Sequence, residues 1–195
     1  AIARALDLGA DDVGTSWLPL FHDMGLIGVM LTALCHPYTV HVLPPERFLM
    51  SPDRWTGVLG QVGATITASP NFGYEMATTR TRGDVFGLES LRASLSGAEP
   101  VRLETIDRFH RRFASAGFRR ESFLPVYGLA ENTLAVTFSE LGRGPRSLRV
   151  DRDSLELHGE AVPVPGHGAE TVSVGRPVAG VRVRVCDDRG RTLPE

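Results

Sequence analysis

Short β-rich runs alternate with helix-length segments between residues 38 and 127, and this rhythm limits the fold more than any other feature of the sequence. The runs over 38–43, 64–68, 91–95 and 123–127 predict strands, and the segments over 53–62, 72–82 and 101–116 predict the helices between them. Such alternation is typical of parallel strands joined by right-handed helical crossovers. The sequence therefore predicts an α/β fold built on a mostly parallel sheet.

The regular alternation stops at Leu141. Residues 142–172 are rich in Gly, Pro, Arg and Asp and have no clean period, which indicates an insertion. Beyond it, valine alternates with arginine over 181–185, a pattern typical of a half-exposed strand. We therefore expect an α/β body over 1–141, an insertion-like segment over 142–172 and the start of a β-rich segment over 173–195. The sequence starts at Ala1, not Met, inside an apparent helix over 1–8, and ends just after an expected strand, so we expect a segment of a longer protein.

Charge and cysteine usage exclude several classes of function. The 21 basic and 23 acidic residues give a net charge of −2 and are interspersed, whereas a nucleic-acid binder usually carries a basic stripe. All the basic residues are arginine, so the chain supplies no catalytic lysine. Cys35 and Cys186 lie far apart and match neither a disulfide framework nor a metal-binding pattern. We expect a cytoplasmic protein that binds no nucleic acid.

The longest apolar stretch covers residues 24–35 and includes two glycines. It is shorter than the roughly 20 residues that a membrane span needs. The first residues also lack the basic-then-apolar pattern of a secretory leader. We therefore expect neither a membrane span nor a leader.

Three loops follow the carboxyl ends of predicted strands, over 69–72, 96–100 and 128–132. Ligands of open parallel sheets bind at this edge. Glycine lets a flat ligand approach the backbone, a carboxylate can hold Mg²⁺, and Tyr127 offers a stacking face. These loops indicate a nucleotide pocket. Glycine and glutamate are also common in ordinary turns, so spacing alone leaves both readings open.

Three segments of the chain carry a family resemblance. Residues 16–28, which read SWLPLFHDMGLIG, resemble a signature of the adenylate-forming superfamily. Residues 96–101 (SGAEPV) resemble its adenine loop, and residues 127–131 (YGLAE) resemble its Y-G-x-[TA]-E motif, in the same order. The details are most similar to fatty acyl-AMP ligases. In that branch an insertion where residues 142–172 lie is linked to transfer of the acyl group to a carrier protein instead of coenzyme A.

The resemblance implies two catalytic side chains: His22 beside the reacting carboxylate, and Glu131 as the ligand of Mg²⁺. It implies that the adenine ring packs on Tyr127. The other residues that it places around ATP are Gly97, Ala98, Glu99, Pro100, Gly128, Leu129 and Ala130. It places the acyl chain against His22, Asn71, Phe72 and Gly73.

The implied activity is the ATP-dependent activation of a fatty acid as acyl-AMP, with release of pyrophosphate and an acyl carrier protein as the acceptor. The family's phosphate loop, ribose-binding aspartate and catalytic lysine do not occur in these residues, so we expect the isolated chain to be inactive. An acyl-CoA ligase or an amino-acid-adenylating domain are alternatives, although only Glu75 lies near Asn71–Tyr74 to hold an ammonium group. A degenerate nucleotide-binding module is the non-enzymatic alternative.

Overall fold

A seven-stranded sheet organises the protein in a computed structural model that describes residues 1–193. The strand order is β2-β1-β3-β4-β5-β6-β9; β1 to β5 run parallel, and β6 and β9 run antiparallel. The prediction of a mostly parallel α/β sheet is confirmed. The strands are β1 (Val13–Ser16), β2 (Thr39–Val42), β3 (Ile66–Ser69), β4 (Ala93–Ser96), β5 (Phe123–Leu129), β6 (Leu134–Phe138) and β9 (Arg176–Pro177).

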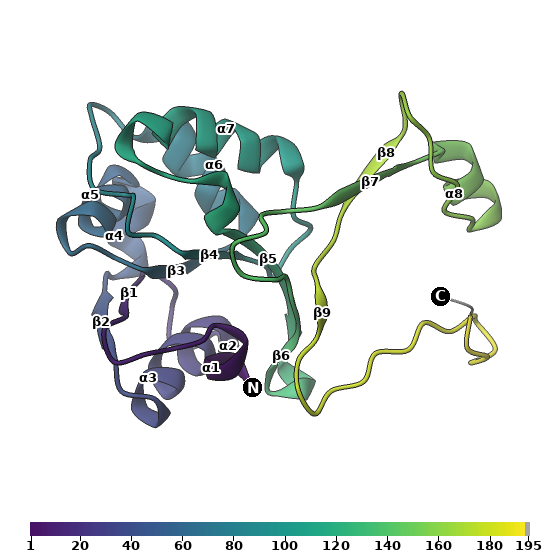
Figure 1. The fold of residues 1–195 in the computed structure, drawn as a ribbon, viewed down its shortest axis with the longest axis horizontal. Helices are drawn as coiled ribbons and strands as arrows, with labels where there is room; N and C mark the ends of the chain where they lie inside the picture. The colour runs from purple at the N-terminus through teal and green to yellow at the C-terminus, as the bar shows by residue number, and fades with distance from the viewer. Residues whose placement is uncertain (194–195) are drawn as a thin grey trace.

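Helices lie on both faces of this sheet (Figure 1). One face carries α4 (Pro45–Met50), α5 (Asp53–Gln61), α6 (Asn71–Arg80) and α7 (Leu103–Phe113). The other carries α1 (Ile2–Ala5), α2 (Asp23–Gly25), the π-helix η1 (Leu26–Leu31) and α3 (Thr32–Cys35). Short 3₁₀ turns complete the body: η2 (Ala114–Ala116), η3 (Arg120–Ser122) and η4 (Ala130–Asn132). No helix within residues 1–193 combines the length and apolar character that a membrane crossing needs.

The main core lies between the sheet and helices α4 to α7, and aromatic rings dominate it. Trp17 stacks on Phe48 with ring centroids 3.9 Å apart, and the ring of Tyr74 lies 5.1 Å from that of Phe109. Aromatic pairs in favourable geometries add about 0.5–1.5 kcal/mol each to the free energy gained from burial. The core therefore fixes the helical face of the sheet rigidly, and the strands present their other face to α1, α2 and η1.

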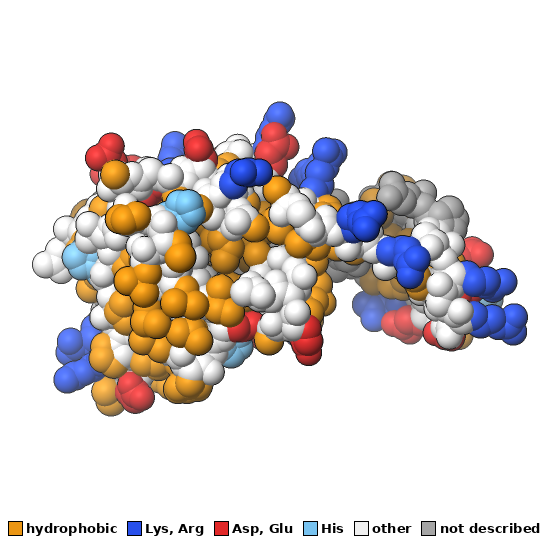
Figure 2. Space-filling model, turned by 90° about the horizontal axis from the view of Figure 1, so that it is seen from below, with side chains coloured by type: hydrophobic (Ala, Val, Ile, Leu, Met, Phe, Trp, Pro, Cys, Tyr) orange, Lys and Arg blue, Asp and Glu red, His pale blue; other side chains and the backbone are white. Residues whose placement is uncertain are grey.

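That second face is apolar but only partly covered. Side chains alternate along a strand, so Ile66, Ala93 and Leu95 all point away from the main core. Leu6 from α1 packs against them. Seen from this side, hydrophobic side chains spread over the surface of the body (Figure 2), and the exposed ones on η1 and α3 are Met30, Leu31 and Leu34. Helix η1 therefore has apolar side chains both toward the sheet and toward solvent.

The insertion-like segment is ordered. Its strands β7 (Ser147–Val150) and β8 (Ala169–Val172) pair antiparallel, and helix α8 (Arg152–His158) lies between them in sequence. Together they form an arm that projects from the body (Figure 1). The boundaries 1–141, 142–172 and 173–195 themselves stay a prediction.

The strand expected over 181–185 does not form. Among described residues beyond 172, only β9 and an isolated bridge between Cys186 and Thr192 have β character, so the β-rich part is minor. Val183 and Val185 are 52% and 65% exposed, and this segment belongs to neither sheet. Residues 194 and 195 of the expected segment lie outside the described residues.

Candidate functional site

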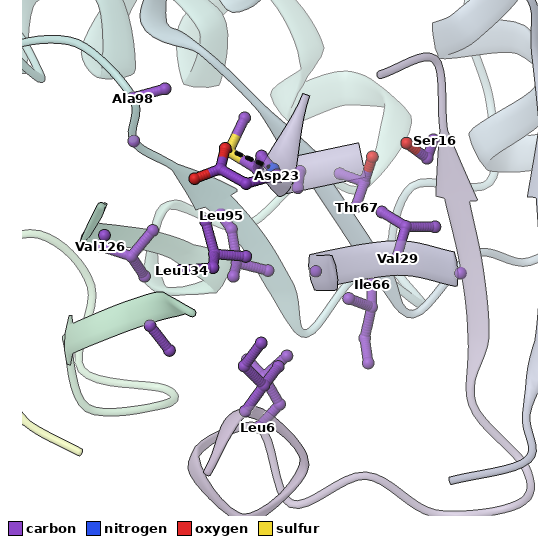
Figure 3. Close-up of a pocket in the computed structure, with 18 of the residues that line it drawn as sticks. Leu6, Ser16, Asp23, Val29, Ile66, Thr67, Leu95, Ala98, Val126 and Leu134 are labelled. Atoms are coloured by element: carbon purple, nitrogen blue, oxygen red, sulfur yellow. Dashed lines mark hydrogen bonds between the residues drawn. The ribbon is translucent and has the colours of Figure 1, made fainter. Parts of the chain in front are cut away.

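A cavity of about 200 Å³ lies on the partly covered face of the sheet, between the strands, η1 and α1 (Figure 3). The strands supply Ile66, Leu95 and Val126 to its floor. Leu6 points into it from the residue just after α1, and Val29 reaches it from η1. Ligand cavities are commonly apolar with a few placed polar groups. This interior suits a hydrocarbon chain.

The residues at the mouth of the cavity come from the carboxyl ends of the parallel strands. Gly97 and Ala98 follow β4 directly, and Tyr127 and Gly128 belong to the end of β5. His22 lies at the same edge, immediately before α2. The cavity therefore joins an apolar interior to a polar mouth at the edge where open parallel sheets bind ligands.

His22 and Asp23 form a fixed pair at the mouth. Nδ1 of His22 accepts the backbone N–H of Met24 at 3.1 Å and lies 2.7 Å from Oδ1 of Asp23. Oδ1 of Asp23 also accepts the N–H of Met24 at 2.8 Å. These contacts orient the imidazole, and Nε2 has no partner within residues 1–193.

Unusual backbone angles cluster around this mouth. Ala98 has φ of +67°, and the consecutive residues Thr133 and Leu134 have φ of +52° and +77°. Side-chain-bearing residues rarely adopt this region, at a cost of about 1–3 kcal/mol each, and such strain gathers at functional sites. Ala98 and Leu134 both line the cavity, so the surrounding structure holds strained backbone at the place where a ligand would bind.

Glycine lets two strands approach closely at the mouth. A Cβ on Gly128 would overlap the backbone oxygen of Leu134, and one on Gly97 would lie 2.9 Å from the oxygen of Val126. Both obstacles are backbone atoms, which cannot rotate away. These positions therefore require glycine for packing, whatever ligand they face.

We expect Gly128→Ala to lower the free energy of unfolding by about 1–3 kcal/mol, because the added methyl group forces β5 and β6 apart. Gly57→Ala is the matched control: Gly57 lies within helix α5, where an added methyl group would meet no neighbouring atom within 4 Å, and the change should be neutral or gain up to about 1 kcal/mol. Urea unfolding of the two variants measures the difference. Equal stabilities would show that Gly128 is not a close-approach position.

The structure brings five of the sequence-predicted site residues together at the cavity: His22, Gly97, Ala98, Tyr127 and Gly128. The others do not line it: Asn71, Phe72, Gly73, Glu99, Pro100, Leu129, Ala130 and Glu131. Their roles stay predictions, and two of them make specific contacts elsewhere.

Asn71 and Glu99 connect neighbouring elements on the far side of the strand ends. Oδ1 of Asn71 accepts the N–H of Arg102 at 3.0 Å, and its amide donates to the hydroxyl of Thr105 at 3.2 Å. This side chain therefore provides hydrogen-bond partners at the start of α7. Oε1 of Glu99 accepts the N–H of Phe72 at 2.6 Å in the first turn of α6. Both contacts fix the loops after β3 and β4 against each other.

Phe72 and Gly73 lie on the helical face of the sheet. Phe72 packs edge-on to Trp17 at 5.8 Å, and a Cβ on Gly73 would meet Trp17 at 2.7 Å. The sheet separates them from the cavity. Pro100 is exposed in the loop that carries Glu99.

Tyr127 lines the mouth, and Glu131 follows four residues later in η4, between β5 and β6. Tyr127 is 47% exposed, so its ring is accessible to a planar ligand. Glu131 is exposed in η4, and within residues 1–193 its carboxylate makes no hydrogen bond or ion pair. The described chain contains no cluster of three metal-ligating side chains. A single free carboxylate suits Mg²⁺, which usually binds one or two carboxylates, water and substrate phosphates.

The sequence reasoning missed the apolar walls of the cavity. Met24, Gly28 and Val29 belong to α2 and η1, and Tyr38 and Phe138 come from strands β2 and β6 or their ends. A signal existed in the apolar run 24–35, which includes two glycines: Gly25 packs closely against the backbone of Pro19, and Gly28 against the side chain of Leu134. The hydroxyl of Thr32 donates to the oxygen of Ile27, five residues back, at 2.7 Å. This contact supports the wide π turn, a feature that often marks functional sites.

A family model described as "AMP-binding enzyme" matches residues 1–195. The chain belongs to the AMP-binding enzyme family. This AMP-binding chain is 37% identical to a putative acyl-CoA synthetase of Caulobacter vibrioides, over 100% of the chain and 35% of that protein. It is 35% identical to the medium-chain-fatty-acid–[acyl-carrier-protein] ligase JamA of Moorena producens, over 94% of the chain and 32% of that protein.

A solved fatty acyl-adenylate ligase from L. pneumophila, in complex with acyl adenylate and pyrophosphate, has the same fold as the AMP-binding chain. The TM-score is 0.89 at 33% identity, covering 95% of this chain and 33% of the other. The chain spans about a third of the length of the curated relatives that it matches.

Proposed function

We propose that the chain forms the acyl- and nucleotide-binding part of an enzyme that activates a fatty acid as acyl-AMP. The observation that carries this proposal is one cavity with an apolar interior and a polar mouth at the carboxyl ends of the strands. The solved relative with bound acyl adenylate supports it, because that molecule joins a hydrocarbon chain to a nucleotide.

In this reaction a carboxylate oxygen attacks the α-phosphate of ATP, and pyrophosphate leaves. The protein contributes mainly position and charge stabilisation, which can account for much of the rate. The apolar interior holds the hydrocarbon and excludes water, and His22, oriented by Asp23, contacts the carboxylate at the mouth. Tyr127 packs against the adenine ring.

Glu131 is the residue that would hold Mg²⁺, which supplies charge neutralisation of the phosphates when it is bound. Its carboxylate is exposed and unpaired within residues 1–193, three residues beyond Gly128 of the mouth, which fits that task. Gly97 and Gly128 allow the close packing of β4, β5 and β6 that shapes the mouth. Glu99 and Asn71 act by positioning the loops that follow the strands.

An acyl carrier protein is the acceptor that we propose for the acyl group. The ligases JamA and TtuA, to which the chain is 35% and 36% identical, are named for this acceptor. The Caulobacter relative is named as a putative acyl-CoA synthetase, so coenzyme A is the competing acceptor.

The test supplies the full-length gene product with Mg-ATP, a series of fatty acids and coenzyme A, and identifies products by mass spectrometry. Acyl-AMP without acyl-CoA is expected. Abundant acyl-CoA would make the protein a CoA ligase, and no adenylate with any acid would contradict the proposed activity.

We expect His22→Ala to lower kcat/KM for the fatty acid about ten- to a hundredfold, as for the loss of a hydrogen bond to a charged group. His36→Ala is the control, because His36 is exposed at the end of α3 and does not line the cavity. Pyrophosphate release under saturating ATP measures both variants. Similar kcat/KM values for the two variants would contradict the placement of His22 at the reacting centre.

A further inference from the structure

One polar side chain lies deep in the cavity, far from the mouth. Tyr38 precedes β2 and lines the cavity, and β1 to β5 all run parallel with their carboxyl ends at the mouth. A residue at the amino end of β2 therefore lies at the opposite edge of the sheet. The cavity lining also includes Gly14, Ile66 and Val29, none of which has a polar side chain.

Gly14 brings the hydroxyl end of the Tyr38 ring against the sheet. A Cβ on Gly14 would lie 2.8 Å from Cε2 and 3.6 Å from Cζ of Tyr38, the ring atoms next to and bearing the phenolic oxygen. Gly14 is in register with Ile66, so it faces the cavity side of the sheet. The absence of a side chain at Gly14 thus makes room for the phenol at the inner end of the cavity.

The Tyr38 hydroxyl keeps its hydrogen-bonding capacity. Over residues 1–193 it has no protein partner, and the nearby carboxylate of Asp12 already accepts bonds from Arg92, Thr65 and the N–H of Gly9. Burial first, and then the charge of Asp12, raise the pKa of Tyr38 above 10.0, so the phenol carries its proton at neutral pH. An apolar cavity thus ends in one free donor.

We propose that the Tyr38 hydroxyl binds an oxygen atom near the far end of the acyl chain, so that the enzyme prefers oxygenated acyl substrates to plain ones. This inference rests on the proposed function, and it adds the substrate class. A site built to pair a substrate oxygen discriminates against the analogue without it, because a plain chain end would cover the partly buried hydroxyl without giving it a partner.

The test compares ω-hydroxy fatty acids with plain fatty acids of the same lengths, using the full-length gene product and pyrophosphate release. Because Tyr38 lies at a fixed distance from the mouth, only one chain length should bring the ω-hydroxyl group to it. At that chain length the hydroxy acid is expected to have a kcat/KM about three- to tenfold above that of the plain acid. Tyr38→Phe should bring that ratio close to one. Gly14→Ala should reduce it as well, because the new methyl group displaces the ring.

Tyr74→Phe is the matched control. It removes the same hydroxyl group on the other face of the sheet, where Tyr74 donates to the oxygen of Leu95, and should retain the ratio. A ratio near one at every chain length in the unaltered protein, or an unchanged ratio in Tyr38→Phe, would overturn the inference. Absence of adenylation with any acid would instead contradict the proposed function.

Discussion

Replacing Glu131 by glutamine is expected to slow pyrophosphate release by the full-length gene product about a hundredfold or more, as for the loss of one charge-stabilising group. Glutamine keeps the shape of the side chain and removes its charge. Glu131 has no ion pair or hydrogen bond within the part of the chain that the structure describes, so the substitution should leave the fold unchanged. The lost rate would then report on ion binding.

A magnesium titration separates this role from a general defect. Glu131→Gln should need a higher Mg²⁺ concentration for half-maximal binding of a non-hydrolysable ATP analogue. Glu140→Gln is the control, because Glu140 is exposed and its ion pair with Arg143 contributes little. The same magnesium dependence in both variants would contradict the assignment of Glu131.

The helices were predictable because their apolar positions recur with the helical period. Ile106, Phe109 and Phe113 are spaced for one face of a helix, and all three are buried in α7. The end of this helix was equally clear: Gly117 has φ of +91°, the left-handed conformation that glycine adopts after helix ends. Local sequence patterns were therefore sufficient to predict most of the α/β body.

Elements that depend on distant partners were missed. Strand β1 has four residues, including Gly14, and gains its place from pairing with β2 and β3. In the sequence alone, Pro44 and Pro45 indicate the end of a strand. Helix α4 in fact begins at Pro45, because proline is also favoured in the first turn of a helix. Strand β6 begins at Leu134, whose φ of +77° is a left-handed backbone conformation that leucine rarely adopts, so the local sequence does not predict it. In each case tertiary contacts outweigh the local signal.

The candidate site was predictable at its mouth and not in its interior. The carboxyl-end rule located Gly97, Ala98, Tyr127 and Gly128, because it needs only the strand order. The interior depends on which face of the sheet η1 and α1 cover, and alternation along a strand does not distinguish the two faces. Asn71 shows the same limit, since its partner Arg102 lies 31 residues away.

Replacing Arg92 by methionine is expected to lower the free energy of unfolding of the chain by about 3 kcal/mol, because it leaves the carboxylate of Asp12 buried without its cation. Arg92 donates to Asp12 at 2.9 and 2.6 Å and to the backbone oxygens of Leu6 and Asp7 at 2.8 and 3.1 Å. The Asp12 side chain is only 8% exposed. Arg143→Met, at an exposed ion pair, should change stability by less than about 0.5 kcal/mol.

The pH dependence of this loss tests its cause. Burial alone would raise the pKa of Asp12, but hydrogen bonds from Arg92, Gly9 and Thr65 outweigh it and lower the pKa from 3.8 to about 2. A depressed carboxyl pKa stabilises the fold above the unfolded value, here by about 2 kcal/mol, and that stability is lost as the pH falls from 3.8 through about 2. The difference between the unaltered chain and Arg92→Met, measured by urea unfolding, should therefore be largest above pH 4 and shrink toward pH 2. A difference that stays constant over this range would assign the loss to the bonds with Leu6 and Asp7, which do not titrate.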